Sequence, residues 1–259
     1  MTPLDALRWD QIYADVQTAL YRPRIRAFLS DVVQLALAAI DRDLAHWSTT
    51  REGGAPFAKA DARALLQATI QAFCLAVQSI WERQLRTRLS DCVHHYGAGD
   101  AAQLRSARMD PFDKLSTLLH QVRDAELTMF PSYPDLEYLQ LVGNACRHGD
   151  GRSSDALFRA HPELWPAWTS APLPWPTDRA PIGPPAVPSF RDAVLPRPLL
   201  TRFVDAIAWF WEDVSYVCMN SFARKNDGIE EEMAAMRCAR AARCAHDDTV
   251  SVAAPRSLI

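Results

Sequence analysis

Apolar residues recur along this chain at steps of three and four residues, which is the spacing of one face of an α-helix. The clearest stripe consists of Leu66, Ile70, Phe73, Val77, Ile80, Trp81, Leu85 and Leu89. It predicts a central helix of roughly thirty residues that starts near residue 61. Because no segment shows the sustained alternation of a strand, the pattern as a whole predicts an all-α protein.

Two other stretches repeat this helical spacing. One stripe contains Ile25, Phe28, Leu29, Val32, Ala36, Ile40, Leu44 and Trp47. A shorter stripe contains Phe112, Leu115, Leu118, Leu119, Val122 and Leu127. Both stripes predict amphipathic helices that pack beside the central helix, so residues 1–160 are expected to form a helical bundle.

A further helix is expected to begin after the segment FPSYPD and to end at His148. Ser132 and Asp135 have the spacing of a capping box, and Pro134 stands in the first turn, where proline is tolerated. Gly149 follows His148 and is the residue type expected in a left-handed helix stop.

The segment 161–198 contains most of the chain's 18 prolines, together with Trp165, Trp168 and Trp175. This composition predicts an irregular strap whose tryptophans anchor it against the bundle. Stacking of nucleic-acid bases on these rings is the functional alternative.

Helical periodicity resumes after the strap, and residues 199–248 are expected to form a helical hairpin that packs back on the bundle, followed by a tail at 249–259. The second helix of this hairpin carries Arg237, Arg240 and Arg243 at helical spacing. A solvated helix face is one interpretation of these arginines, and a nucleic-acid-binding stripe is the other.

The composition is that of a globular protein, with 49% apolar residues, 23% charged residues and a formal net charge of −3. This charge gives no general attraction to nucleic acid, so any such binding requires a local basic patch. The uncharged run at 64–81 contains glutamines and is interpreted as a buried helix, so no membrane partner is expected. The N-terminus lacks the pattern of a secretory signal, which favours the cytoplasm.

The six cysteines include no CxxC pair and are interpreted as structural thiols. Cys238, Cys244 and His246 do not have the spacing of a common zinc site, so neither a metal nor a cofactor is expected. The neighbouring His94 and His95 are interpreted as surface residues.

The most informative segment, GNACRHGDG at 143–151, has three interpretations. It can be a helix stop, in which Arg147 and His148 bond the last carbonyl groups and Asn144 bonds across the bundle. Its Arg147-His148-Gly149 triplet also matches the signature of histidine phosphatases, but that signature requires a preceding parallel strand, which the pattern lacks.

The third interpretation is a family resemblance. Asn144 and His148, on a late helix of a bundle spanning residues 5–160, resemble the RNase motif of HEPN domains in an Asn-x-x-x-His-Gly-Asp-Gly form. The usual arginine of that motif is Gly143 here, and Arg147 lies one helical turn later on the same face. The resemblance implies an up-and-down helical bundle.

The same resemblance implies an RNA-binding or RNA-cleaving component of a bacterial toxin or antiphage defence system. It also implies a homodimer in which two motifs face each other, with a further protein partner from the same operon. The alternative on the same scaffold is a non-catalytic helical protein that binds other proteins.

Metal-independent cleavage of RNA needs a group that moves a proton near neutral pH and a cation beside the phosphate. His148 and Arg147 are the candidates for these two roles, with Asn144 as the third candidate catalytic residue. The helix dipole at this helix end favours the charged form of the imidazole.

Overall fold

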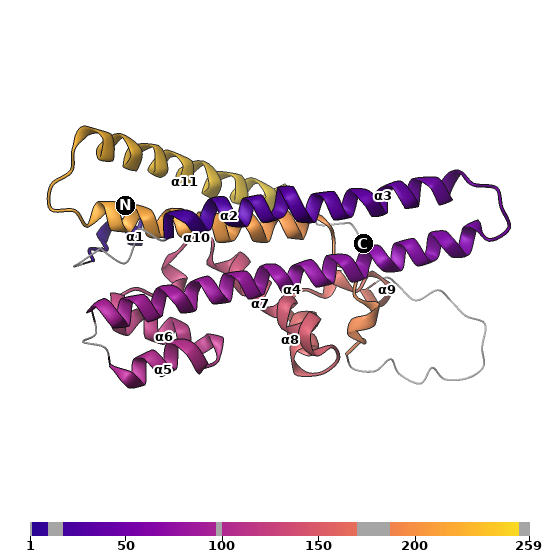
Figure 1. Cartoon of the computed structure of the whole chain (residues 1–259), viewed down its shortest axis with the longest axis horizontal. Helices are drawn as coiled ribbons and strands as arrows, with labels where there is room; N and C mark the ends of the chain where they lie inside the picture. The colour runs from indigo at the N-terminus through magenta and orange to yellow at the C-terminus, as the bar shows by residue number, and fades with distance from the viewer. Residues whose placement is uncertain (1, 10–17, 97–99, 170–186, 254–259) are drawn as a thin grey trace. The chain divides into compact units, whose positions relative to one another are not determined.

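The computed structural model describes residues 2–9, 18–96, 100–169 and 187–253. Every regular element within these ranges is a helix (Figure 1), so the prediction of an all-α helical bundle is confirmed for the described part of the chain. The helical spacing of apolar residues was therefore a correct guide to the fold class.

The predicted central helix is α4, which extends over Ala55–Tyr96 and is longer than expected at both ends. Its predicted stripe forms the buried face, because Ile70, Val77 and Trp81 are each exposed by 1% or less. The buried face continues beyond the stripe with Cys92 and Val93, which explains the extra turn at the C-terminal end.

The helix expected over residues 25–47 is interrupted by a π-helical turn. It consists of α2 (Tyr21–Phe28), the π-turn η2 (Leu29–Val33) and α3 (Gln34–Thr49). A π-turn inserts one residue into the helical repeat, so the buried face after it shifts by one position. Val33 and Leu37 are buried, whereas Val32 is 46% exposed, so the predicted placement of Val32 on the buried face is wrong.

The remaining helices are all shorter than α4, and the two longest of them, α10 and α11, lie near the C-terminus. They are α1 (Pro3–Ala6), α5 (Ala101–Met109), α6 (Phe112–Arg123), η3 (Leu127–Met129), α7 (Tyr133–His148), α8 (Arg152–Ala160), η4 (Pro162–Leu164), α9 (Pro166–Thr169), η5 (Phe190–Asp192), α10 (Pro198–Asn220) and α11 (Asp227–Ala253). The helices α10 and α11 correspond to the two helices expected over residues 199–248.

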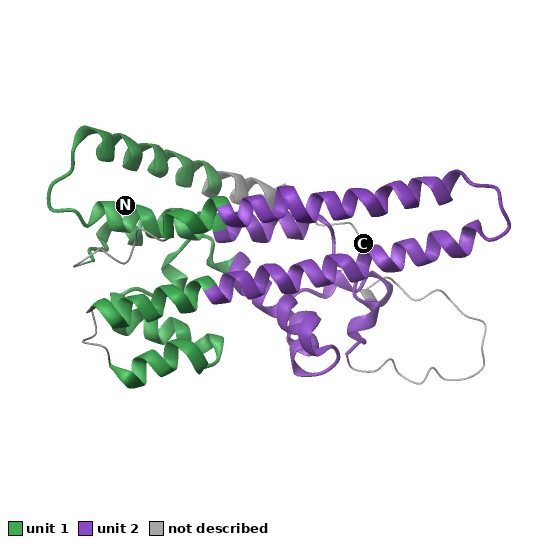
Figure 2. Cartoon of the chain, viewed as in Figure 1, with its two compact units in different colours: residues 1–23, 84–134, 208–259 green, residues 24–83, 135–207 purple. Residues whose placement is uncertain are grey.

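The chain forms two compact units, each assembled from segments that are distant in sequence (Figure 2). Unit 1 consists of residues 1–23, 84–134 and 208–259, and unit 2 of residues 24–83 and 135–207. Both α4 and α10 therefore contribute one part to each unit. The predicted division into 1–160, 161–198 and 199–248 follows the order of the sequence and does not coincide with these units.

The described ends of the strap are anchored in unit 2, as the tryptophans predicted. Trp165 is fully buried, and its Nε1 donates a hydrogen bond of 2.8 Å to the carbonyl of Ser189. Trp168 is half-buried, and Trp175 lies outside the described residues. Beyond Ser189 the chain is held to α4, where the amide of Gln67 both accepts from and donates to the backbone of Leu195.

Replacing the buried anchor should cost more stability than replacing its half-buried neighbour. We expect Trp165→Ala to lower the free energy of unfolding by about 3–5 kcal/mol, because it leaves a cavity and an unbonded carbonyl. Trp168→Ala is the matched control and should cost clearly less. Urea unfolding followed by circular dichroism measures both, and equal losses would contradict the anchoring role of Trp165.

Candidate functional site

The motif 143–151 lies on the last turn of α7 and on the loop that follows, within unit 2. The start of α7 differs from the prediction. Ser132 Oγ is buried and has no hydrogen-bond partner among the described residues, and Asp135 instead accepts a 2.8 Å hydrogen bond from Arg202. The predicted capping box is therefore wrong, whereas Pro134 does lie in the first turn.

At Gly143 the backbone of α7 lies close to α4. A Cβ atom at position 143 would lie 2.6 Å from Cγ and 2.7 Å from Cβ of Gln78, which is too close for any side chain. These atoms of Gln78 are next to its backbone and cannot swing away freely. The packing of the two helices therefore leaves room only for glycine at this position.

Gln78 is also the centre of a polar network between the two helices. Its Nε2 donates to Gln140 Oε1 and to Glu82 Oε2, each at 2.9 Å, and its Oε1 accepts a 2.8 Å bond from Arg147 Nη2. Arg147 thus extends back over the turn that begins at Gly143. The guanidinium group lies beside the side chain of Gln78, which packs against Gly143.

The three candidate catalytic residues differ in exposure. Arg147 and His148 are exposed, and Asn144 is half-buried. The carbonyl of Ala145 at the helix end accepts a 2.8 Å bond from the backbone of Gly149, not from a side chain of the motif. Between these residues, burial raises the pKa of the Cys146 thiol to about 12, so this thiol is a poor nucleophile.

The Gly-Asp-Gly loop that follows has a structural role. Gly149 has φ of +66° and Gly151 has φ of +131°, so both positions favour glycine, and Gly149 is the predicted left-handed stop. Asp150 between them accepts hydrogen bonds from the Ser189 hydroxyl and, at 2.6 Å, from the backbone of Phe190. The loop therefore fixes the end of the strap beside the motif.

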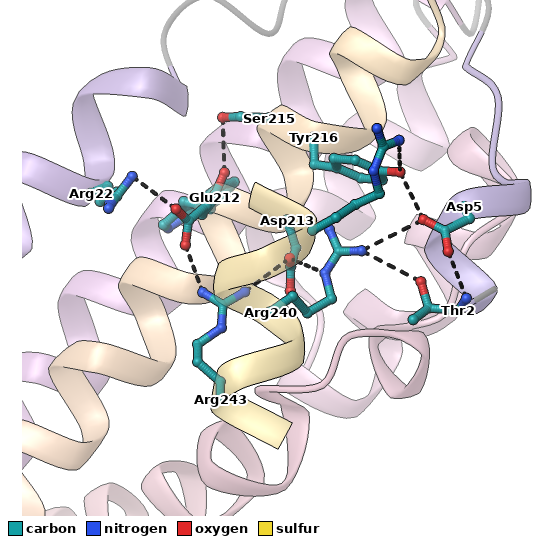
Figure 3. Close-up of polar contacts among 11 residues, drawn as sticks. Thr2, Asp5, Arg22, Glu212, Asp213, Ser215, Tyr216, Arg240 and Arg243 are labelled. Carbon is teal, nitrogen blue, oxygen red and sulfur yellow. Dashed lines mark hydrogen bonds and ion pairs between the residues drawn. The ribbon is translucent and has the colours of Figure 1, made fainter. Parts of the chain in front are cut away.

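The arginine stripe of α11 is mostly engaged inside unit 1 (Figure 3). Arg240 is only 3% exposed and binds Asp213 at 2.9 Å, so the expectation of a solvated face is wrong for this residue. Arg243 binds Glu212 at 2.6 Å. Arg237 is exposed and lies 3.5 Å from the Tyr216 hydroxyl. Burial leaves Arg240 no surface to present to a nucleic-acid phosphate.

Side chains from α10, α2 and α1 complete this cluster. Glu212 also binds Arg22 at 3.1 Å, and Asp5 near the N-terminus accepts a 2.7 Å bond from the Tyr216 hydroxyl. Burial raises the pKa of Asp213 even though two guanidinium groups beside it act in the opposite direction. The sequence signal for the cluster was the adjacent Glu212 and Asp213 within the apolar stretch of α10.

The remaining candidate residues are the histidine pair of α4 and the cysteines and histidine near the C-terminus. His94 and His95 are exposed near the end of α4, as expected. Among the described residues no group of three or more histidine, cysteine or acidic side chains could hold a metal ion. Cys238 is exposed, and the side chains of Cys244 and His246 lie outside the described residues.

The fold and the end of α7 together describe this protein as a helical bundle that exposes an Arg-His pair at the end of one helix. The chain matches no protein-family model, no curated protein sequence and no solved structure. The assignment of function therefore depends on the residues of this chain.

The close approach at Gly143 can be tested by a single methyl group. We expect Gly143→Ala to lower the free energy of unfolding by about 1–3 kcal/mol, because the new Cβ overlaps Gln78 and forces the helices apart. Gly53→Ala is the control, since no atom lies within 4 Å of its added Cβ. Similar effects at 143 and 53 would contradict the packing constraint.

The buried ion pair in unit 1 gives a second test. We expect Arg240→Leu to lower the free energy of unfolding by about 3–5 kcal/mol, because buried Asp213 loses the nearer of its two guanidinium partners and keeps only Arg243, at 3.4 Å. The double variant Arg240→Leu/Asp213→Leu should recover most of that loss. Arg237→Leu, at the exposed end of the stripe, is the control and should cost little. If Arg240→Leu were as mild as the control, Arg240 would be a surface residue.

Proposed function

We propose that the last turn of α7 binds RNA, with Arg147 as the cation that contacts phosphate and His148 as the group that transfers a proton. The supporting observation is that both side chains are exposed on consecutive positions, while Gln78 fixes Arg147 at 2.8 Å. This bond uses one guanidinium nitrogen, and the remaining donors suit a phosphate group. An imidazole beside a bound phosphate can act as acid or base without a metal.

We further propose that the chain is a HEPN-like protein that acts in the cytoplasm within a bacterial toxin or antiphage defence system. In this proposal it works as a homodimer whose motifs face each other, with a protein partner from the same operon. The helical architecture and the place of Asn144 and His148 on a late helix support it. Since Gly143 cannot carry the usual arginine, Arg147 takes over its charge, and the isolated protein cleaves RNA weakly.

A second candidate function is a non-catalytic interaction protein on the same scaffold. The bond between Arg147 and Gln78 favours it, because this bond joins α7 to α4 whether or not RNA is present. In that case Arg147 is a structural residue, and the exposure of His148 has no chemical consequence. The two functions predict different effects of the same substitutions.

We expect His148→Ala to abolish RNA cleavage measured in the presence of a chelator, and to abolish any growth arrest that expression causes. Because His148 is exposed, the free energy of unfolding of this variant should differ from that of the wild-type protein by less than about 1 kcal/mol. Arg147→Gln should weaken binding of single-stranded RNA by about tenfold and lower its salt dependence, as for the loss of one phosphate contact.

His120→Ala is the matched control, because His120 is an exposed histidine on α6, far from the motif in sequence. It should leave RNA binding and cleavage unchanged. The proposal is wrong if the wild-type protein binds no RNA, or if His148→Ala behaves like His120→Ala. A loss of about 1–3 kcal/mol of stability in Asn144→Ala without any RNA phenotype would instead support the structural role.

A further inference from the structure

The middle of α4 has apolar residues all round the helix, and only some of them are buried in unit 2. Residues 64–81 contain no charged residue, and a helix that is apolar all round is normally buried all round. Within residues 64–81, Ala64, Leu65, Ala68 and Ala72 are exposed, and most of the others are half-buried. Ile70, Val77 and Trp81 form the covered side, so a second apolar side remains open.

The open side has the spacing of a helix–helix contact. Leu65, Ala68, Ala72, Leu75 and Ser79 follow one another at steps of three, four, three and four residues, and we call this set the α4 seam. Such steps form a continuous stripe against which a second helix can pack. Leu65 is 54% exposed, Ala68 and Ala72 are exposed, and Leu75 and Ser79 are half-buried.

The neighbouring η2 and α3 expose apolar side chains at about the same level along α4. The rings of Phe28 and Phe73 lie 6.1 Å apart, which sets the level of the antiparallel pair formed by α2–α3 and α4 (Figure 1). Counting back from that contact puts Val32 and Leu35 at about the level of the α4 seam. Val32 is 46% exposed and Leu35 is 65% exposed.

We propose that the α4 seam is the contact surface of a homodimer in which two copies of α4 pack antiparallel about a two-fold axis. The order of its first four residues, Leu65–Ala68–Ala72–Leu75, is the same when read in either direction. A two-fold axis midway between Ala68 and Ala72 sets each leucine against the other leucine of the second copy, and each alanine against the other alanine. This reciprocity is what an interface between identical chains requires.

The side chains at the centre and at the ends of the seam fit this arrangement. The two alanines at the centre permit a close approach of the helix backbones. At the ends, Asp61 and Arg83 are exposed on the same side of α4. An antiparallel partner brings each aspartate near the arginine of the other copy, whereas a parallel partner would set like charges side by side.

The available area is that of a modest dimer. The stretch 57–83 is about 40 Å long and a helix is about 10–12 Å wide, so this face of α4 offers roughly 400–500 Å². A standard interface buries about 800 Å² on each partner. The remaining area has to come from other elements, and Val32 on η2 and Leu35 on α3 are exposed apolar side chains at about the level of the seam.

A protein partner explains this surface better than a lipid bilayer. By length and composition α4 could cross a membrane, but the core helix of a globular protein meets the same criteria. The amides of Gln67 and Gln78 on this helix bond other protein groups, on Leu195 and Gln140. Alanines at the centre of a heptad-spaced stripe permit close packing of a second helix, whereas contact with lipid does not depend on this spacing.

The test places a charge on the seam without disturbing the monomer. Ala68→Glu and Ala72→Glu introduce a good helix former at exposed positions, so the circular dichroism spectrum should be unchanged. We expect the wild-type protein to be a dimer at micromolar concentration by light scattering, and each variant to weaken dimerisation by at least about tenfold. Ala60→Glu, at an exposed alanine of α4 outside the seam, should remain a dimer.

Cysteine cross-linking tests the orientation. Under mild oxidation, a mixture of Ala68→Cys and Ala72→Cys chains should form a disulfide between positions 68 and 72, identified by mass spectrometry of the linked peptides. Each variant alone should cross-link more slowly. A wild-type monomer, a dimer that is insensitive to charges on the seam, or faster cross-linking of Ala68→Cys with itself would overturn the proposal. A monomer that floats with phospholipid vesicles would overturn it in favour of a membrane.

The α4 seam goes beyond the proposed function, on which it rests only for the expectation of a dimer. An axis midway between Ala68 and Ala72 sets Gln78 opposite position 62 of the second copy, so the two α7 ends lie about 24 Å apart along α4. The seam is therefore an alternative to a dimer in which the motifs face each other. Light scattering and cross-linking report on the seam alone, whereas RNA binding by His148→Ala and Arg147→Gln reports on the end of α7. A dimer without RNA binding would therefore overturn the RNA site and leave the seam in place.

Discussion

The arrangement of unit 2 depends on one close approach, at which the backbone of Gly143 meets the side chain of Gln78. This contact brings α7 near enough to α4 for an amide network to form between them, and it leaves room for no side chain at position 143. The network then holds Arg147, whose guanidinium bonds Gln78. The position of the Arg147 guanidinium thus depends on the packing of two buried helix faces.

Unit 1 is held by a different kind of interaction. Asp213 and Arg240 are both almost fully buried, and such a pair is tolerated only when each charge has a partner of the opposite sign. The cluster joins α10 to α11 and, through Asp5, to the N-terminal segment (Figure 3). Removing one member is therefore more costly than replacing a pair with apolar residues.

The sequence predicted much of the helical layout, because apolar spacing and glycine stops are local signals. The central helix, the left-handed stop at Gly149 and the anchor Trp165 were all expected from residue type and position. The π-turn at 29–33 was not expected, because the apolar residues before and after it also have the spacing of one uninterrupted helix. The capping box failed because Asp135 bonds Arg202, which is distant in sequence.

The candidate site was predictable in its residues but not in its geometry. Sequence identified Asn144, Arg147 and His148, and it could not show that Gln78 fills the space above Gly143. The buried role of Arg240 was missed for a similar reason, since a stripe of arginines at helical spacing is the same whether it faces water or a carboxylate. Only the position of Asp213 on the facing helix distinguishes the two cases.

The most direct test of the central claim is a nuclear magnetic resonance titration with a short single-stranded RNA, observing the imidazole of His148 and the guanidinium of Arg147. If the end of α7 is an RNA site, these two signals should shift together and saturate, while the signals of His94 and His95 stay in place. If RNA moves the signals of His94 and His95 equally, or leaves those of Arg147 and His148 unchanged, the end of α7 is a structural helix terminus and not an RNA site.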